Sequence, residues 1–330
     1  MNQISTPVSG QYAFERFKSF SRWKRAAKGA LTRLIGLDEL LALERKPIVP
    51  EPLWKRKIEL GTIEKIAFES EPGFRTFAYV CLPKKAKAPC KTFICLQGHS
   101  TGMHTSIAVE WKDETTPKAI EGDRDFAIGC LQRGIAAVCL EQRCMGEHST
   151  NENREPSCFV PTMIRLLGRR TTLAERIYDV DRLVDYLYAR KDIDRTHIGL
   201  MGNSGGGTTT MFAGALLDRI THSMPSCSFS SFRDSIGAMQ HCACNYIPGL
   251  LLYGETADAV GLTAPKPVVV VNGVEDPIFP IRAANEQFER MKKIYAAAGA
   301  PGNCVHAIGK EGHRFYAKEG WDAMSEFFLK

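Results

Sequence analysis

The sequence lacks long apolar runs, internal repeats and low-complexity tracts. No segment of the 330 residues approaches the roughly 20 uninterrupted apolar residues that a membrane-spanning helix needs. The first stretch, residues 1–20, is polar and lacks the continuous apolar centre of a secretion signal. We therefore expect a protein with neither a membrane span nor an export signal.

A strong excess of charge of one sign is also absent. The net charge of +6 is small for this length, and no block of lysine and arginine is dense enough to form a nucleic-acid patch. We therefore expect no nucleic-acid partner. Hydrophobic residues make up 44% of the chain, which is enough to bury a large core.

Cysteine is plentiful, but its pattern does not indicate a disulfide framework. There are eleven cysteines, an odd number, and several lie inside apolar runs, among them Cys81, Cys95 and Cys139. In such runs a free cysteine behaves as a small buried hydrophobic residue. Together with the missing export signal, this pattern predicts a reduced, cytoplasmic protein.

The chain divides into a basic N-terminal arm with a linker, residues 1–55, and a larger domain, residues 56–330. A helical pattern with a partial apolar face runs from about Phe14 to Leu43. This helix either docks on a partner or an anionic surface, or packs on its own domain with its charged face in solvent. The three prolines between Pro47 and Pro52 then indicate a linker.

Short apolar strands alternate with helices through the larger domain. This order predicts an α/β fold with a mostly parallel central sheet flanked by helices. Residues 226–262 form a possible lid or pocket insertion with several aromatic residues. The expected strands lie at 63–68, 76–81, 92–96, 135–140, 198–201, 268–271 and 305–308, and the main helices at 126–133, 171–190, 205–217, 283–298 and 320–329.

The most informative motif is Gly-x-Ser-x-Gly at residues 202–206, which reads Gly202-Asn203-Ser204-Gly205-Gly206. It lies between an expected strand and an expected helix, where a serine on a tight turn needs neighbours without a Cβ atom. At the helix N-terminus, free N–H groups and the dipole favour an oxyanion. The stretch lacks the Lys-Ser/Thr ending of a phosphate-binding loop and the spacing of a dinucleotide fingerprint. Ser204 is therefore the predicted nucleophile.

A serine nucleophile needs a base, and the base needs an orienting acid. In a fold of this kind the acid and then the histidine follow the serine along the chain. Asp276 and Glu275 both follow an apolar strand, and we favour Asp276 because the following prolines make its turn rigid. His313 lies on a loop between the last strand and the last helix, where a general base is expected.

The oxyanion hole is expected to combine the backbone N–H groups of Gly205 and His99. His99 follows Gln97-Gly98 directly after an expected strand. The run His241-Cys242-Ala243-Cys244 holds soft metal ligands, but no second pair of ligands follows at the spacing of a zinc finger. We therefore expect neither a metal nor a cofactor.

The motifs also resemble a known family. Gly202–Gly207, Asn272–Pro277 and Gly312–Phe315 look like α/β-hydrolases of the acetyl-xylan-esterase-like group, which adjoins the dienelactone hydrolases and the catalytic domains of prolyl oligopeptidases. The similarity covers roughly residues 60–330. It implies hydrolysis of carboxylic esters, often deacetylation of a sugar, with Ser204, Asp276 and His313 as the triad. The dienelactone hydrolases use a cysteine nucleophile, whereas position 204 is a serine.

These observations lead to one main hypothesis and two alternatives. The main one is a serine esterase acting on short-chain acyl esters of a sugar or another small molecule. The first alternative is a small serine peptidase or amidase. The second is a non-catalytic binding protein that keeps the same fold. The sequence leaves open whether the chain forms a homo-oligomer.

Overall fold

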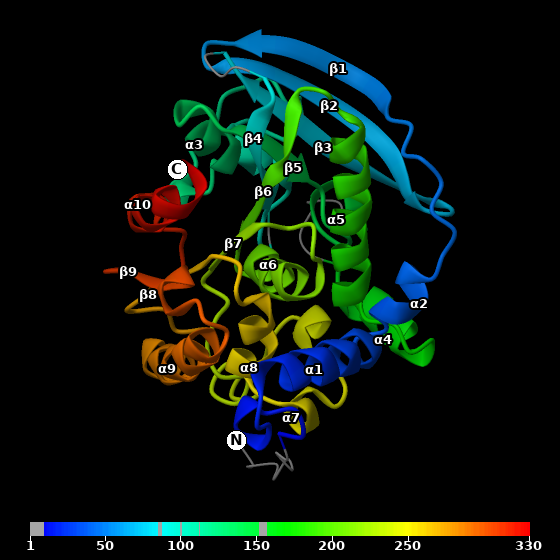
Figure 1. The fold of residues 1–330 in the computed structure, drawn as a ribbon. Helices are drawn as coiled ribbons and strands as arrows, with labels where there is room; N and C mark the ends of the chain where they lie inside the picture. Colours follow the sequence, from blue (N-terminus) through cyan, green and yellow to red (C-terminus); the bar gives the residue numbers. More distant parts are fainter. Residues whose placement is uncertain (1–9, 85–87, 100, 112, 152–156) are drawn as a thin grey trace.

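A nine-stranded sheet forms the centre of the computed structural model, which describes residues 10–84, 88–99, 101–111, 113–151 and 157–330 (Figure 1). The strand order is β1-β2-β3-β5-β4-β6-β7-β8-β9. The strands from β5 through β4 to β9 pair in parallel, whereas β1, β2, β3 and β5 pair antiparallel. The expected mostly parallel sheet is therefore confirmed. The strands are β1 Glu51–Ile58, β2 Gly61–Glu71, β3 Phe74–Pro83, β4 Cys90–Leu96, β5 Ala136–Leu140, β6 Ile193–Asn203, β7 His222–Ser226, β8 Val268–Gly273 and β9 Cys304–Gly309.

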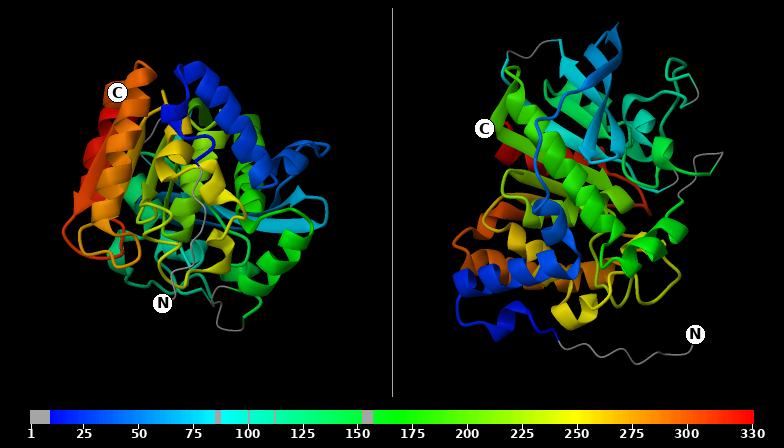
Figure 2. Two further views of the ribbon diagram at one scale, coloured as in Figure 1. Left: turned by 90° about the horizontal axis from the view of Figure 1, so that it is seen from below. Right: turned by 90° about the vertical axis from the view of Figure 1, so that its right-hand side faces the viewer.

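Helices cover both faces of the sheet, and each face has its own hydrophobic cluster. One cluster includes side chains of α3 and α10, and the other includes side chains of α1, α5, α6 and α9. Figures 1 and 2 show α10 on one side of the sheet and α5 on the other. The helices are α1 Phe20–Leu34, α2 Leu37–Leu41, α3 Phe126–Gln132, α4 Phe159–Leu167, α5 Thr172–Ala189, α6 Gly205–Leu216, α7 Leu250–Tyr253, α8 Thr256–Val260, α9 Ile281–Ala297 and α10 Ala317–Phe328.

Strand β1 differs from the sequence expectation. It begins at Glu51, inside the expected linker, so the expected boundary between residues 55 and 56 falls within the strand. The proline-rich run and the mainly exposed side chains of β1 give it a weak strand pattern. Pairing with β2 forms it nevertheless, and the register shifts between Pro52 and Trp54. An edge strand tolerates a proline and a bulge of this kind.

The N-terminal arm packs on the rest of the chain. Helix α1 starts after Ser19, whose side chain accepts a hydrogen bond from the Arg22 N–H. Its apolar stripe, Trp23, Ala27 and Leu31, is fully buried in the same cluster as residues of α5 and α6. Residues 1–9 of the predicted arm lie outside the described residues.

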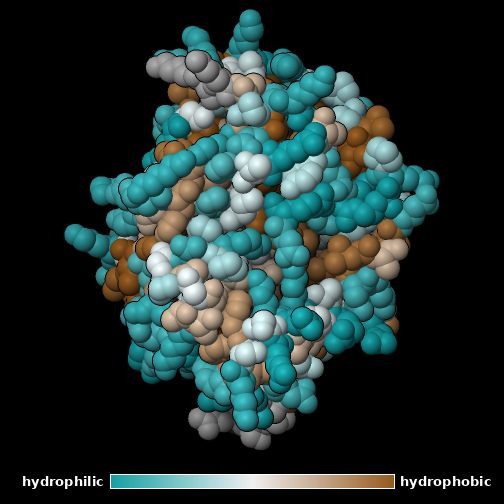
Figure 3. Space-filling view, viewed as in Figure 1, coloured by the Kyte–Doolittle hydropathy of each residue, from teal (hydrophilic) through white to brown (hydrophobic). Residues whose placement is uncertain are grey.

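Hydrophilic residues cover most of the surface seen in Figure 3, with separate hydrophobic patches between them. Helix α4 exposes several large apolar side chains, of which Leu167 is the most exposed, at 88%. Within the part of the chain that the structure describes, no helix combines the length and apolar character required to cross a bilayer.

Candidate active site

Ser204 lies on a sharp turn between β6 and α6. Its backbone has φ 55° and ψ −119°, a conformation that non-glycine residues rarely adopt and that costs about 1–3 kcal/mol. The residue is the N-cap of α6, and the first N–H groups of a helix have no partner within it. The turn therefore presents the serine beside free backbone donors at the carboxyl edge of the sheet.

Close backbone packing explains the glycines around Ser204. A Cβ atom at Gly206 would lie 2.1 Å from the carbonyl oxygen of Leu96, and one at Gly202 would lie 2.5 Å from the carbonyl carbon of Gly206. Neither distance is possible without moving the backbone. Asn203 is buried and accepts a hydrogen bond from Ser226 Oγ at 2.9 Å, which holds the end of β6 against β7.

Asp276 and His313 form a hydrogen-bonded pair. Oδ2 of Asp276 lies 2.8 Å from Nδ1 of His313, and Oδ1 accepts the backbone N–H groups of Ile278 and Phe279 at 2.9 and 3.1 Å. Burial alone would raise the pKa of Asp276, but the His313 bond and these N–H groups hold it below its ordinary value. The Asp276 side chain is fully buried and that of His313 is 23% exposed. The pair thus joins a fixed, ionised acid to an accessible imidazole.

A short chain of contacts connects Ser204 with this pair. The N–H of Ser204 donates to the carbonyl of Ser226 at 2.9 Å. The next residue, Cys227, has its Sγ within 4.8 Å of ligand atoms of both Asp276 and His313. The turn at Ser204 and the Asp276–His313 pair therefore both lie at the edge of the sheet where β6, β7, β8 and β9 end. Open α/β sheets place their sites at this edge.

Cys227 is a second side chain with reactive potential at this point. Burial, followed by the nearby Asp276, raises the pKa of its thiol to about 12. The thiol donates to the carbonyl of Arg314 at 3.0 Å. A protonated, buried thiol is a poor nucleophile. Although Cys227, Asp276 and His313 are close enough to hold a metal, their chemistry fits an acid–imidazole pair better.

His99, the predicted second oxyanion donor, lies on the loop that follows β4. Its Cε1 and Nδ1 atoms are 2.6 and 2.7 Å from the position that a Cβ atom at Gly205 would occupy, so the ring packs against the start of α6. Its Nε2 is 3.1 Å from Sγ of Cys244. Burial lowers the pKa of His99, but Cys244 and Cys158 raise it to about 9.

Residues 141–147, to which the sequence assigns no chemistry, support this loop. Gln142 donates through Nε2 to the carbonyl of Gln97 and accepts from Thr209 Oγ1 at 2.8 Å. It therefore ties the loop after β4 to helix α6. The methyl group of Met145 lies 2.9 Å from the Cβ position of Gly205. The only sequence signal for these roles is the position of the segment directly after a strand.

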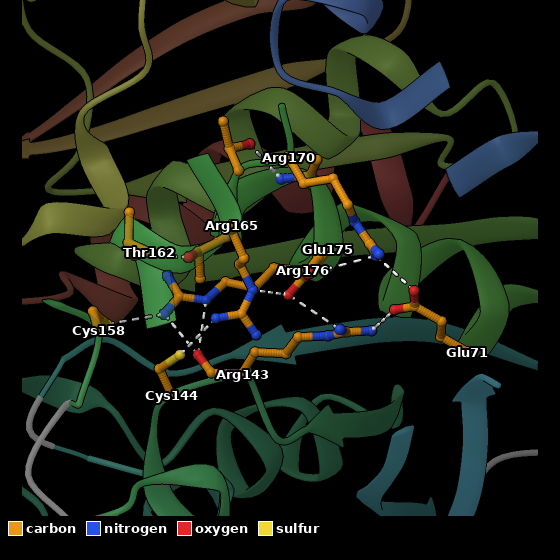
Figure 4. A network of polar contacts seen from close by, with 12 residues as sticks. Glu71, Arg143, Cys144, Cys158, Thr162, Arg165, Arg170, Glu175 and Arg176 are labelled. Carbon is orange, nitrogen blue, oxygen red and sulfur yellow. Dashed lines mark hydrogen bonds and ion pairs between the residues drawn. The ribbon is translucent and has the colours of Figure 1, made fainter. Parts of the chain in front are cut away.

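A buried ionic network lies behind the same segment (Figure 4). Arg143, only 4% exposed, contacts the carboxylates of Asp179, Glu175 and Glu71 at 2.8, 3.1 and 2.9 Å. Burial lowers the pKa of Arg143, but these acids, led by Asp179, raise it above its ordinary value. The network joins β2, the loop after β5 and helix α5, so it fixes the position of the loop that carries Gln142.

Two cavities lie on different parts of the molecule. A polar cavity of about 470 Å³ opens beside His313 and is lined by Glu121, Gly122, Arg124, Glu311, His313 and Arg314. An apolar cavity of about 460 Å³ is lined by Leu166 and by residues between 232 and 252. Its lining includes no member of the predicted triad. The polar cavity is therefore the better candidate for substrate.

The fold defines the class of protein: the sheet order, the helices on both faces and the turn at Ser204 are those of the α/β-hydrolase fold. No protein-family model matches this sequence. The chain is 24% identical over 273 residues to "Putative hydrolase YtaP" of Bacillus subtilis (strain 168), a match that covers 80% of this chain and 86% of that protein.

Solved structures of other proteins share the fold. A "putative acetyl xylan esterase" of Bacteroides fragilis NCTC 9343 is 17% identical with a TM-score of 0.75, covering 95% of this chain and 80% of its own. The methylesterase BT1017 is 24% identical with a TM-score of 0.73, covering 96% of this chain and 67% of its own. The resemblance to the acetyl-xylan-esterase-like group is therefore confirmed at the level of the fold.

Proposed function

We propose that this protein is a serine hydrolase that cleaves carboxylic esters through a triad of Ser204, His313 and Asp276. The observation that carries the proposal is the strained turn at Ser204 beside the hydrogen-bonded Asp276–His313 pair. Strain of this kind persists only where the surrounding structure maintains it, and it concentrates at active sites. The hydrolase and esterase names of the relatives support the same class of reaction.

The reaction follows from the arrangement of these groups. Asp276 accepts a hydrogen bond from the Nδ1–H of His313, which leaves Nε2 free to take the proton of Ser204 as its oxygen attacks the ester carbonyl. The backbone N–H groups of Gly205 and His99 stabilise the oxyanion, and the loss of one such donor costs about 3 kcal/mol. His313 then protonates the leaving alcohol, and water hydrolyses the acyl-enzyme in the reverse sequence.

The substrate that we propose is a short-chain ester of a sugar or another polar small molecule. The cavity beside His313 is lined by charged residues, among them Arg124 and Arg314. Such a lining suits a hydroxyl-rich alcohol better than a long acyl chain. The name of the acetyl xylan esterase also favours a carbohydrate ester.

Fluorophosphonate labelling and a substrate panel test this proposal. We expect the wild-type protein to be labelled and to hydrolyse nitrophenyl acetate faster than nitrophenyl esters of longer acids or aminoacyl anilides. Ser204→Ala should remove both labelling and turnover, whereas Ser223→Ala, a buried serine on β7, should retain both. Faster cleavage of the anilides would favour a peptidase. A folded protein without labelling or turnover would favour a non-catalytic binding protein.

A further inference from the structure

Four side chains with soft or imidazole ligand atoms converge beside the candidate active site. The ligand atoms of His99, Cys158, Cys242 and Cys244 all lie within 4.8 Å of one another. They come from three separate parts of the chain: the loop after β4, the residue preceding α4, and the expected insertion at residues 226–262. Cys158 and Cys244 are buried, and His99 and Cys242 are half-buried.

The distances within this group approach those of a tetrahedral metal site. Zinc binds cysteine sulfur at about 2.3 Å and histidine nitrogen at about 2.0–2.1 Å, so tetrahedral ligand atoms lie about 3.5–3.8 Å apart. Cys242 Sγ and Cys244 Sγ are 3.4 Å apart, and His99 Nε2 is 3.1 Å from Cys244 Sγ. An ion at the centre would require these two contacts to widen by only a few tenths of an ångström.

We propose that His99, Cys158, Cys242 and Cys244 form a structural zinc site. Four protein ligands complete a tetrahedron, so no position remains for substrate or a reactive water, and the zinc is structural. Binding forms one Zn–N and three Zn–S bonds, and any protons carried by the ligand atoms leave to solvent. The metal would fasten the insertion and the residue before α4 to the loop that carries the predicted oxyanion donor.

The buried charge of Arg176 is an independent observation in favour of the site. This arginine is 3% exposed, and across the described parts of the chain no carboxylate forms an ion pair with it. Its Nη1 donates to Cys244 Sγ at 3.3 Å, and its Nη2 to Cys158 Sγ at 3.4 Å. Nε and Nη2 also donate to the carbonyl of Arg143 (Figure 4).

A buried cation needs an opposite charge nearby. A zinc ion with three thiolates and a neutral imidazole carries one net negative charge, which matches the single positive charge of Arg176. Its N–H groups point at two of the proposed ligand sulfurs, the usual role of a group that orients and stabilises metal ligands. Without an ion, one of the three thiols would have to be ionised to supply that counter-charge.

Cys144 packs in the same cluster as Cys158 and Cys244, but four other buried cysteines lack these features. Cys81, Cys95, Cys130 and Cys139 lie in the apolar cluster with α3 and α10, among aromatic and aliphatic side chains. Their surroundings fit small hydrophobic residues. Only the group at His99 combines three sulfurs with an imidazole and a buried arginine, among the residues that the structure describes.

Metal analysis of the full chain tests the site. After expression with added zinc and purification under reducing conditions without chelator, we expect about one zinc ion per chain by elemental mass spectrometry. Cys158→Ser and Cys244→Ser should reduce this at least about tenfold. Cys304→Ala, which removes a buried thiol on β9, should retain the zinc. Ser204→Ala should also retain it, which separates this test from that of the hydrolase activity.

Cobalt substitution keeps the proposal testable even if the serine variants do not fold. Wild-type protein stripped of zinc and titrated with Co²⁺ should show thiolate-to-cobalt charge transfer and the intense visible bands of a tetrahedral complex. The site would be overturned if the wild-type protein held less than about a tenth of an equivalent of zinc, both as purified and after reconstitution, and also showed no such cobalt bands. A Cys242–Cys244 disulfide detected by peptide mapping of the reduced preparation would overturn it as well.

Discussion

Nδ1 of His313 lies 2.8 Å from Oδ2 of Asp276, although the two residues come from different loops at the ends of β8 and β9. In the proposed mechanism this bond fixes the tautomer of His313, and with it the nitrogen that takes the proton of Ser204. Asp276→Asn should therefore lower kcat by about 10³–10⁴-fold with a small change in KM, because the imidazole would then adopt the wrong tautomer. Steady-state kinetics on nitrophenyl acetate measure this.

Glu275→Gln is the matched control for that prediction. Glu275 is adjacent and exposed, and the sequence alone did not separate it completely from Asp276. We expect its kinetics to stay within about threefold of wild type, since surface substitutions rarely have large effects. If Glu275→Gln lost activity and Asp276→Asn kept it, the acid of the triad would be reassigned.

Gly206→Ala should disable the turn at Ser204. The new Cβ atom would lie 2.1 Å from the carbonyl oxygen of Leu96, so the backbone must shift. We expect the free energy of unfolding to fall by about 1–3 kcal/mol. We expect kcat to fall by a large factor, because the serine would be displaced from its reactive position. Gly302→Ala, at a position with no atom within 4 Å of the new Cβ, should leave both unchanged. Denaturant unfolding and kinetics together check this, and normal activity in Gly206→Ala would contradict the packing argument.

Cys227→Ala should retain most of the activity. The thiol of Cys227 has its pKa raised to about 12, first by burial and then by Asp276, so it is protonated at neutral pH. It cannot replace Ser204 as nucleophile. We expect fluorophosphonate labelling to persist in Cys227→Ala. Complete inactivation, with the fold intact by circular dichroism, would show that the thiol takes part in the reaction.

Arg143→Met should destabilise the protein by about 3–5 kcal/mol, because it leaves Asp179, Glu175 and Glu71 without their shared buried cation. The matched comparison is Arg75→Met, which removes a surface pair with Glu51 whose side chains are 50% and 61% exposed. That change should cost about 0–1 kcal/mol. Urea unfolding of both variants measures the difference, and equal losses would count against the buried network.

The buried His222 should contribute to acid sensitivity. Burial, followed by the charge of His197, lowers the pKa of His222 to about 4, whereas an unfolded histidine titrates near about 6.5. Its contribution to stability is present above about pH 6.5 and is lost as the pH falls through about 4. His222→Phe keeps a ring beside Phe328 and should make the fall in unfolding free energy between these pH values shallower. An unchanged slope would contradict the assignment.

The order and type of most strands and helices could be predicted from sequence, because apolar runs and the spacing of apolar residues indicate which side chains are buried. The weak pattern of β1 shows the limit: its side chains are mainly exposed, and pairing with β2 forms the strand. The turn at residues 202–206 was predictable for a local reason, since its glycines relieve contacts between residues close in sequence or in adjacent strands.

The sequence by itself determined the elbow, the chain order of serine, acid and histidine, and the layered α/β architecture, because each depends on local residue types and spacing. Only the tertiary structure decided which distant side chains meet. It joined Asp276 to His313 and brought His99 and Cys158 to the Cys242–Cys244 pair, which the sequence alone had set aside as a metal site. The physical reason is that ligand distances and counter-charges such as Arg176 arise from packing between elements, and no spacing along the chain encodes them.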